Sequence, residues 1–287
     1  MAIFATELGF PEGPVLLDDG CFLCVEMSPE TGQVSHLSAD GKVKRVLAKT
    51  GRPNGLALDK YGNIWVAETD QRALLKMALD GQYEVFADRC GEEGFMFPND
   101  VAVGPDGAIY MTDSGILEED LAPGGDVNPD WYTMPFDGKI FRIDPDTRDV
   151  TCLCQGIQFA NGLAFSPEGK LYANETLSGE IFEITPGGER IFFGNVVEEV
   201  RASDEMKGPD GMKFAADGSS YHCVFGQGDV TVLGPDGQVA ARHPVKGAYP
   251  TNLVFGNSGE IYVTEMETGS IQCLNVGVEG LPLCGQN

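Results

Sequence analysis

The chain has 287 residues, of which 42% are hydrophobic, and this is sufficient for one large core or for two ordinary domains. It carries 19 basic and 44 acidic residues, and the resulting net charge of −25 disfavours binding to nucleic-acid phosphates and to anionic lipids. The sequence has no run of about 18 apolar residues, the length that a membrane-spanning helix requires. We therefore expect neither nucleic acid nor a membrane as a partner.

Six segments of the sequence repeat one pattern over sixteen ungapped positions. Each contains an apolar stretch, a glycine at the tenth position and a second apolar stretch, which indicates a hairpin because tight turns with positive φ favour glycine. More strand-like sequence follows each hairpin, and four-stranded repeats of about 40–45 residues are typical of propeller blades. The sequence therefore predicts an all-β fold, a six-bladed β-propeller forming one domain over residues 1–287. The repeats begin at Pro11, Pro53, Pro98, Ala160, Pro209 and Pro250.

The two ends of the chain are predicted to share one blade. Residues 2–6 resemble the fourth strands of other blades, such as 83–87, whereas the last repeat supplies three strands that end near Val276. We predict that the N-terminal strand completes the C-terminal blade. This closure would hide two strand edges that otherwise invite aggregation.

Two longer connections are predicted to lie near one end of the central channel. An insertion at 115–137 lengthens the third repeat after its second strand, and we interpret it as a lid, with a flexible acidic loop as the alternative. Within it, Trp131 is a candidate wall of a substrate site. Residues 198–207 lead into the fifth repeat and bring Arg201 towards the same place. Phe225, just after the second strand of that repeat, is a further candidate wall.

The second position of every repeat is polar. Because the first strand of each blade lines the channel, these residues are expected to form one ring. Two of them are carboxylates, which repel each other in a narrow channel unless a cation lies between them. Asparagine and aspartate before glycine are also common turn formers. Because every member offers oxygen, we predict one divalent metal ion, Ca²⁺ first, with Mg²⁺, Mn²⁺, Zn²⁺ or Fe²⁺ as alternatives. The ring consists of Glu12, Asn54, Asn99, Asn161, Asp210 and Thr251.

Other features narrow the chemistry and the location. The sequence has no G-x-S-x-G turn, P-loop or dinucleotide-binding motif, and its three histidines fall in outer strands or strand middles, which disfavours a serine triad. We interpret all eight cysteines as reduced and mostly buried, because alternation would point Cys21 and Cys24 to opposite faces of a strand. With no secretory signal in the first residues, this favours a cytoplasmic location.

Several motifs are similar to those of one family. The chain resembles the gluconolactonase/regucalcin (senescence marker protein) family over its whole length. The resemblance implies that Glu12, Asn161 and Asp210 bind the metal directly, that Asn99 orients the substrate and that Asp210 is the general base. The matching motifs are Glu12-Gly13-Pro14, Pro98-Asn99-Asp100 with Thr112-Asp113, Asn161-Gly162-Leu163 and Pro209-Asp210-Gly211.

The resemblance also implies a reaction, the hydrolysis of sugar lactones, other lactones or, in some members, organophosphates. Sugar-lactone members often carry an arginine two residues before the position of Asn99, and here that residue is Phe97. This departure favours a larger or less polar lactone. We thus predict a metal-dependent lactonase acting on a small molecule, with the metal polarising the carbonyl, Asp210 activating water, and Asn99 and Asn54 holding ring oxygens.

Three alternatives remain open from the sequence. Another hydrolase, acting on an organophosphate or aryl ester, could use the same metal, although the histidine pair of paraoxonase-like propellers is missing. A lactone isomerase or eliminating enzyme would use the same residues. A non-catalytic binding propeller is the third, since 109–113 (IYMTD) and 261–265 (IYVTE) are similar to the Y-W-T-D repeats of receptor propellers.

Overall fold

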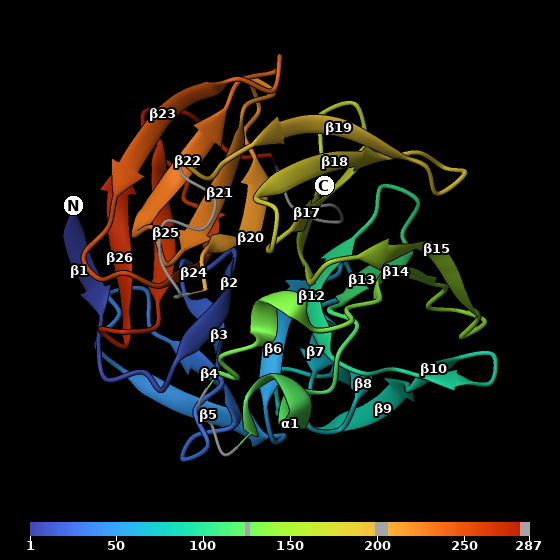
Figure 1. Cartoon of the computed structure of the whole chain (residues 1–287). Helices are drawn as coiled ribbons and strands as arrows, with labels where there is room; N and C mark the ends of the chain where they lie inside the picture. Colours follow the sequence, from blue (N-terminus) through green and yellow to red (C-terminus); the bar gives the residue numbers. More distant parts are fainter. Residues whose placement is uncertain (124–126, 199–205, 282–287) are drawn as a thin grey trace.

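The computed structural model of the chain describes residues 1–123, 127–198 and 206–281. In this part of the chain, six four-stranded antiparallel sheets are arranged around a central channel (Figure 1). The first strands of neighbouring blades contact one another and form the channel wall. The predicted six-bladed β-propeller is therefore confirmed.

The blades follow one another along the chain, each as an antiparallel meander from the channel outwards. Blades 1 to 3 comprise β2 (Pro11–Leu16), β3 (Phe22–Glu26), β4 (Gln33–Leu37) and β5 (Lys44–Lys49); β6 (Pro53–Leu58), β7 (Ile64–Glu68), β8 (Ala73–Met77) and β9 (Tyr83–Ala87); and β12 (Pro98–Val103), β13 (Ile109–Asp113), β14 (Gly138–Ile143) and β15 (Val150–Ile157). A small hairpin, β10 (Arg89–Cys90) and β11 (Glu93–Gly94), joins blades 2 and 3.

The second half of the ring has the same organisation. Blades 4 and 5 comprise β16 (Ala160–Phe165), β17 (Leu171–Glu175), β18 (Glu180–Ile184) and β19 (Arg190–Asn195); and β20 (Gly208–Phe214), β21 (Ser220–Phe225), β22 (Asp229–Leu233) and β23 (Val239–Pro244). Blade 6 comprises β24 (Pro250–Phe255), β25 (Glu260–Glu265), β26 (Ser270–Asn275) and β1 (Ala2–Ala5).

The ring closes as the sequence predicts. Strand β1 pairs antiparallel with β26, with Ala2 opposite Cys273 and Ile3 opposite Gln272. The N-terminal strand is thus the outer strand of the C-terminal blade, so each end of the described chain protects an edge of the other.

The tenth residue of each repeat adopts the conformation that its glycine permits. These residues form the turn between the first and second strands, and their φ angles lie between 76° and 85°. A side chain would be strained there, which explains the one invariant position of the repeats. The glycines are Gly20, Gly62, Gly107, Gly169, Gly218 and Gly259.

The hydrophobic core is divided among the spaces between neighbouring blades. Between blades 1 and 2, for example, Val34 packs in one cluster with Ile64 and Leu75. Both faces of a blade are covered by its neighbours, so every residue of β7 is buried and the strand does not alternate between apolar and polar residues. Trp65, in the same strand, is buried with its indole N–H donating to the carboxylate of Asp59 at 2.9 Å.

The insertion in blade 3 is folded against the end of the channel. It contains α1 (Glu118–Leu121) and a 3₁₀ turn, η2 (Trp131–Thr133). Figure 1 shows α1 in front of blade 2, between the labels β5 and β8. Arg72 in blade 2 forms an ion pair of 2.7 Å with Glu119, which ties α1 to that blade. Side chains from the insertion and from blades 3 and 4 form what we call the cap cluster: Phe97, Ile116, Leu121, Trp131, Phe159 and Leu177.

Fewer of the described cysteines are buried than the sequence predicts. All seven cysteines in the described ranges are free thiols, and Cys24, Cys154 and Cys223 are buried. Cys284 lies outside those ranges. Across the same residues, no helix is long and apolar enough to cross a membrane.

Candidate active site

The polar ring lies where the pairing between the first two strands of each blade becomes irregular. In every blade the register shifts just after the ring position, as between Glu12 and Val15 or between Pro98 and Val101. Such irregularities redirect side chains, and here they occur six times around one channel. Five ring residues are at most 7% exposed, and Asp210 retains intermediate exposure.

Hydroxyl groups hold the ring asparagines and join neighbouring blades. The Asn99 amide donates to Ser114 Oγ at 3.1 Å, and the Asn161 amide donates to Thr176 Oγ1 at 3.3 Å. The same hydroxyls donate across the blade boundary, Ser114 to the carbonyl of Ala160 and Thr176 to that of Pro209. The side chains of Asn99 and Asn161 are thereby fixed before any ligand arrives, which is the preorganisation a catalytic site requires.

Three carboxylates, rather than two, influence one another at the ring. Burial, with the charges of Asp100 and then Asp210, raises the pKa of Glu12 well above its usual value. Burial and the charge of Asp100 likewise raise the pKa of Asp210, although a hydrogen bond from Asn161 opposes this. Burial also raises the pKa of Asp100. The site therefore disfavours three negative charges together unless a cation offsets them.

Sequence reasoning missed Asp100 and Asn252, although it noted glycines beside the ring. Both occupy the third position of a repeat, which is glycine in the other four repeats. A Cβ on Gly55 would lie 2.5 Å from Asp100 Cα, and one on Gly211 would lie 2.1 Å from Asn252 Cγ. The glycines thus leave the space that these two side chains fill. The side chain of Asn252 opposes the rise in the pKa of both Glu12 and Asp100.

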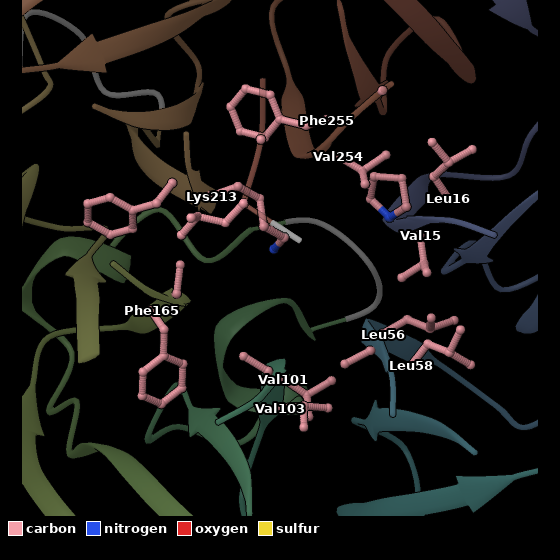
Figure 2. A pocket seen from close by; sticks show the side chains of 18 of the residues that line it. Val15, Leu16, Leu56, Leu58, Val101, Val103, Phe165, Lys213, Val254 and Phe255 are labelled. Atoms are coloured by element: carbon pink, nitrogen blue, oxygen red, sulfur yellow. The ribbon is translucent and has the colours of Figure 1, made fainter. Parts of the chain in front are cut away.

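A half-buried lysine lies between the ring and the other half of the channel. Lys213, three residues after Asp210, lies near Asn252, with 3.5 Å between Nζ and Oδ1. Its charge opposes the rise in the pKa of both Glu12 and Asp100. Figure 2 shows its side chain directed into a cavity of about 450 Å³, whose walls include Val15, Leu56, Val101, Phe165, Val254 and Phe255. The channel therefore has a polar, acidic half at the ring and a largely apolar half beyond it.

The histidines lie away from the ring, as predicted. His36 is in β4 and His243 in β23, whereas His222 is fully buried in the middle of β21, with its Nε2 2.8 Å from Ser220 Oγ. Burial lowers the pKa of His222 to about 3. The imidazole is therefore neutral at physiological pH, and its position gives it no access to the ring.

This buried histidine makes stability depend on pH. The folded state resists protonation of His222 and the unfolded state does not, so stability falls as the pH drops from 6.5 towards 3. At about pH 4.5 we expect a loss of about 2–3 kcal/mol that His222→Gln removes. Urea unfolding of both proteins at about pH 7.5 and pH 4.5 measures the difference, with His243→Gln as the control. Equal acid sensitivity in the wild type and His222→Gln would contradict the prediction.

Comparison with known proteins identifies the family. Residues 10–267 match the sequence model of the SMP-30/Gluconolactonase/LRE-like region. The chain belongs to this family. It is 27% identical to the gluconolactonase of Zymomonas mobilis subsp. mobilis over 282 residues, which cover 90% of this chain and 76% of that protein. The resemblance read from the motifs is confirmed.

Two solved structures share the fold of this SMP-30/gluconolactonase/LRE-like protein. A gluconolactonase from Xanthomonas campestris superposes with a TM-score of 0.77 at 23% identity, covering 96% of this chain and 88% of that one. Regucalcin, a calcium-binding protein from Agrobacterium tumefaciens, superposes with a TM-score of 0.75 at 19% identity, covering 97% and 94%. At these identities the likeness establishes the shared propeller.

The residues that the family resemblance assigns to a metal are suited to a hard cation. Glu12 Oε2 is buried and has no hydrogen-bond partner within the described residues. Glu12 and Asp210 supply carboxylate oxygens and Asn161 an amide oxygen, the donor types that Ca²⁺ and Mg²⁺ prefer. Across the described ranges, no group of three His, Cys, Asp or Glu side chains is arranged to hold an ion. A metal here would therefore depend on the amide as well as the two carboxylates.

The predicted substrate residues fall into three groups. Asn54 and Asn99 belong to the buried ring. Phe97 and Trp131 are only 3% and 7% exposed and pack inside the cap cluster. Phe225 ends β21 and stacks on Tyr249, with 4.6 Å between the ring centroids. Arg201 lies outside the described residues. The structure thus brings Phe97 and Trp131 together in the cap and separates Phe225 from them.

Proposed function

We propose that this protein is a metal-dependent lactonase whose site is the acidic ring. The observation that carries the proposal is the state of the Glu12 carboxylate. Its Oε2 has no partner among the described residues, and the negative charges of Asp100 and Asp210 act on it. The relationship to a gluconolactonase over 90% of the chain supports ring-opening of a lactone. The free thiols of the described cysteines support a cytoplasmic location.

We propose Glu12, Asn161 and Asp210 as the ligands of one divalent ion, with Ca²⁺ the first choice because every donor is oxygen. When bound, this ion would supply Lewis-acid polarisation of the lactone carbonyl. The named calcium binding of the regucalcin structure is consistent with that choice. Asp100 stays outside this set because its Oδ1 and Oδ2 accept backbone N–H groups of Val101 and Leu163 at 2.8 and 3.3 Å.

In the proposed mechanism, Asp210 is the general base. It is the one ring carboxylate that retains solvent exposure, so it can accept a proton from a water that attacks the carbonyl carbon. Asn99, fixed by Ser114, holds a ring oxygen of the substrate, and Asn54 in the neighbouring blade holds another. Cleavage of the acyl carbon–oxygen bond then gives a hydroxy acid, whose new hydroxyl group takes up the proton.

The cap cluster would control access to this reaction. Its side chains, including Trp131 and Phe159, cover the ring end of blades 3 and 4 with apolar surface. Excluding bulk water from a site of this kind strengthens the interaction of fixed charges and dipoles with the developing oxyanion. Opening of the cap cluster would admit the substrate.

A proton-release assay on a panel of lactones tests the proposal. The protein is first treated with a chelator, and then Ca²⁺, Mg²⁺, Mn²⁺, Zn²⁺ or Fe²⁺ is restored separately. We expect turnover of at least one lactone to disappear with the chelator and to return with a single divalent metal. Metal binding without turnover of any lactone would support the proposed metal site and reject the proposed lactonase reaction. Absence of both would favour a non-catalytic binding propeller.

A further inference from the structure

Arg52 lies at the ring end of the channel, two residues before Asn54. Its guanidinium lies over the ring of Phe97, with 5.3 Å between Cζ and the ring centroid. Phe97 is buried in the cap cluster, so it is a fixed platform for the cation. On α1, Glu118 is 3.9 Å away, measured from its Oε1 to Arg52 Nε, which is too long for a hydrogen bond. Blade 2, blade 3 and the cap thus enclose one guanidinium.

One nitrogen of this guanidinium has no partner. Arg52 Nη1 is buried and has no hydrogen-bond acceptor among the residues the structure describes, although the side chain as a whole is 28% exposed. The hydroxyl of Thr50, two residues earlier, is a second buried polar atom for which the described part of the chain offers no partner. Buried donors and acceptors are normally satisfied, so an unpaired donor beside a candidate active site indicates a ligand that supplies the acceptor.

We propose that Arg52 Nη1 binds a ring hydroxyl of the substrate and so selects hydroxylated lactones over unsubstituted ones, in contrast to the less polar lactone that Phe97 favours when the sequence is considered alone. This inference rests on the proposed lactonase function. Arg52 holds the same offset before Asn54 that Phe97 holds before Asn99. The guanidinium therefore comes from blade 2 and lies on the aromatic ring supplied by blade 3.

The charges around Arg52 favour a neutral hydroxyl over a carboxylate as its ligand. Burial lowers the pKa of Arg52, and the carboxylates of Glu118, Asp70 and Glu68 oppose that change. The guanidinium thus already has negative charge on several sides, in a chain whose net charge is −25. A carboxylate on the ligand would be repelled by these groups, whereas a hydroxyl oxygen accepts the hydrogen bond without adding charge.

Matched substrates separate this role from a structural one. Glucono-1,5-lactone and δ-valerolactone share a six-membered ring and differ in their hydroxyl groups. We expect Arg52→Met to lower kcat/KM for the hydroxylated lactone by about 10- to 100-fold, and for the unsubstituted one by less than about 3-fold. Arg52→Lys should recover part of the loss, because it restores the charge without the planar stack on Phe97. Arg89→Met, which removes an exposed arginine paired with Asp88, is the control and should alter neither substrate.

The outcomes distinguish failure of this inference from failure of the proposed function. Equal losses on both lactones, or no loss on either, would overturn the role of Arg52 and leave the lactonase intact. If the wild type opens neither lactone, calorimetry with 1,5-anhydroglucitol, which keeps ring hydroxyls and lacks the carbonyl, decides the matter. Binding that Arg52→Met weakens at least about tenfold would uphold the hydroxyl site without the reaction. Undetectable binding, or equal binding by both proteins, would reject it.

Discussion

Replacing Asp210 with asparagine is expected to lower kcat by about 10²- to 10⁴-fold, the usual contribution of a positioned general base. The amide keeps one oxygen for a metal but cannot accept a proton from the attacking water. Because Asp210 is also a proposed ligand, turnover is measured at saturating metal, so that weaker binding does not contribute to the loss. The assay records proton release from the lactone that the wild type opens fastest.

A matched control for this variant is available in the same blade. Asp236 lies in the exposed turn between β22 and β23 and accepts a backbone hydrogen bond from Gln238 at 3.1 Å. Asp236→Asn should leave kcat unchanged. If Asp210→Asn retains near-normal kcat at saturating metal, Asp210 is not the base, and its ring position then reflects metal binding or charge balance alone.

Changing Glu12 to glutamine is expected to stabilise the metal-free protein while removing the response to metal. Glu12 Oε2 lacks a partner among the described residues, and its carboxylate is crowded by Asp100 and Asp210. The neutral amide relieves this repulsion, which we estimate at about 1–2 kcal/mol of unfolding free energy. The same change removes one of the two proposed carboxylate ligands, so lactone turnover should be lost.

Thermal unfolding with chelator and with excess Ca²⁺ measures both effects. The wild type should gain stability when Ca²⁺ is added, because an ion that binds only the folded state shifts the equilibrium towards it. The variant should start from a higher melting temperature and show no gain. A variant that is less stable without metal and still gains stability with Ca²⁺ would show that Glu12 is a structural carboxylate.

The repeat made the fold predictable from the sequence. A glycine at the tenth position of every repeat fixes the turn, and the strands on either side follow from it. The polar ring was predictable for the same reason, since one position of a repeat recurs at one level of the channel. Closure by residues 2–6 followed from counting strands and from the resemblance of this segment to the fourth strands, and the observed strand is Ala2–Ala5.

The missed residues depend on contacts between repeats. Asp100 and Asn252 fill the spaces beside Gly55 and Gly211, and the sequence does not show which side chain lies against which glycine. Arg52 lies outside the sixteen-position pattern. Its offset before Asn54 was visible, but its stacking on Phe97 requires the positions of two blades.

The cap illustrates the same limit. Phe97 was predicted to contact the substrate, because it stands where sugar-lactone members of the family often carry an arginine. The structure packs its ring among residues of the insertion and of blade 4, with 5.9 Å between the centroids of Phe97 and Phe159. Burial of this kind depends on how a 23-residue insertion at 115–137 folds back, and the repeat contains no information about that.

The most direct test of the metal-dependent lactonase is a titration of the metal-free protein with Ca²⁺, in which heat and lactone opening are recorded on the same sample. We predict that one Ca²⁺ ion binds per chain and that lactone turnover rises in proportion to the occupancy of the metal site and saturates with it. Full turnover by the metal-free protein before any ion binds would contradict this prediction. Loss of that turnover once Ca²⁺ occupies the site would contradict it as well.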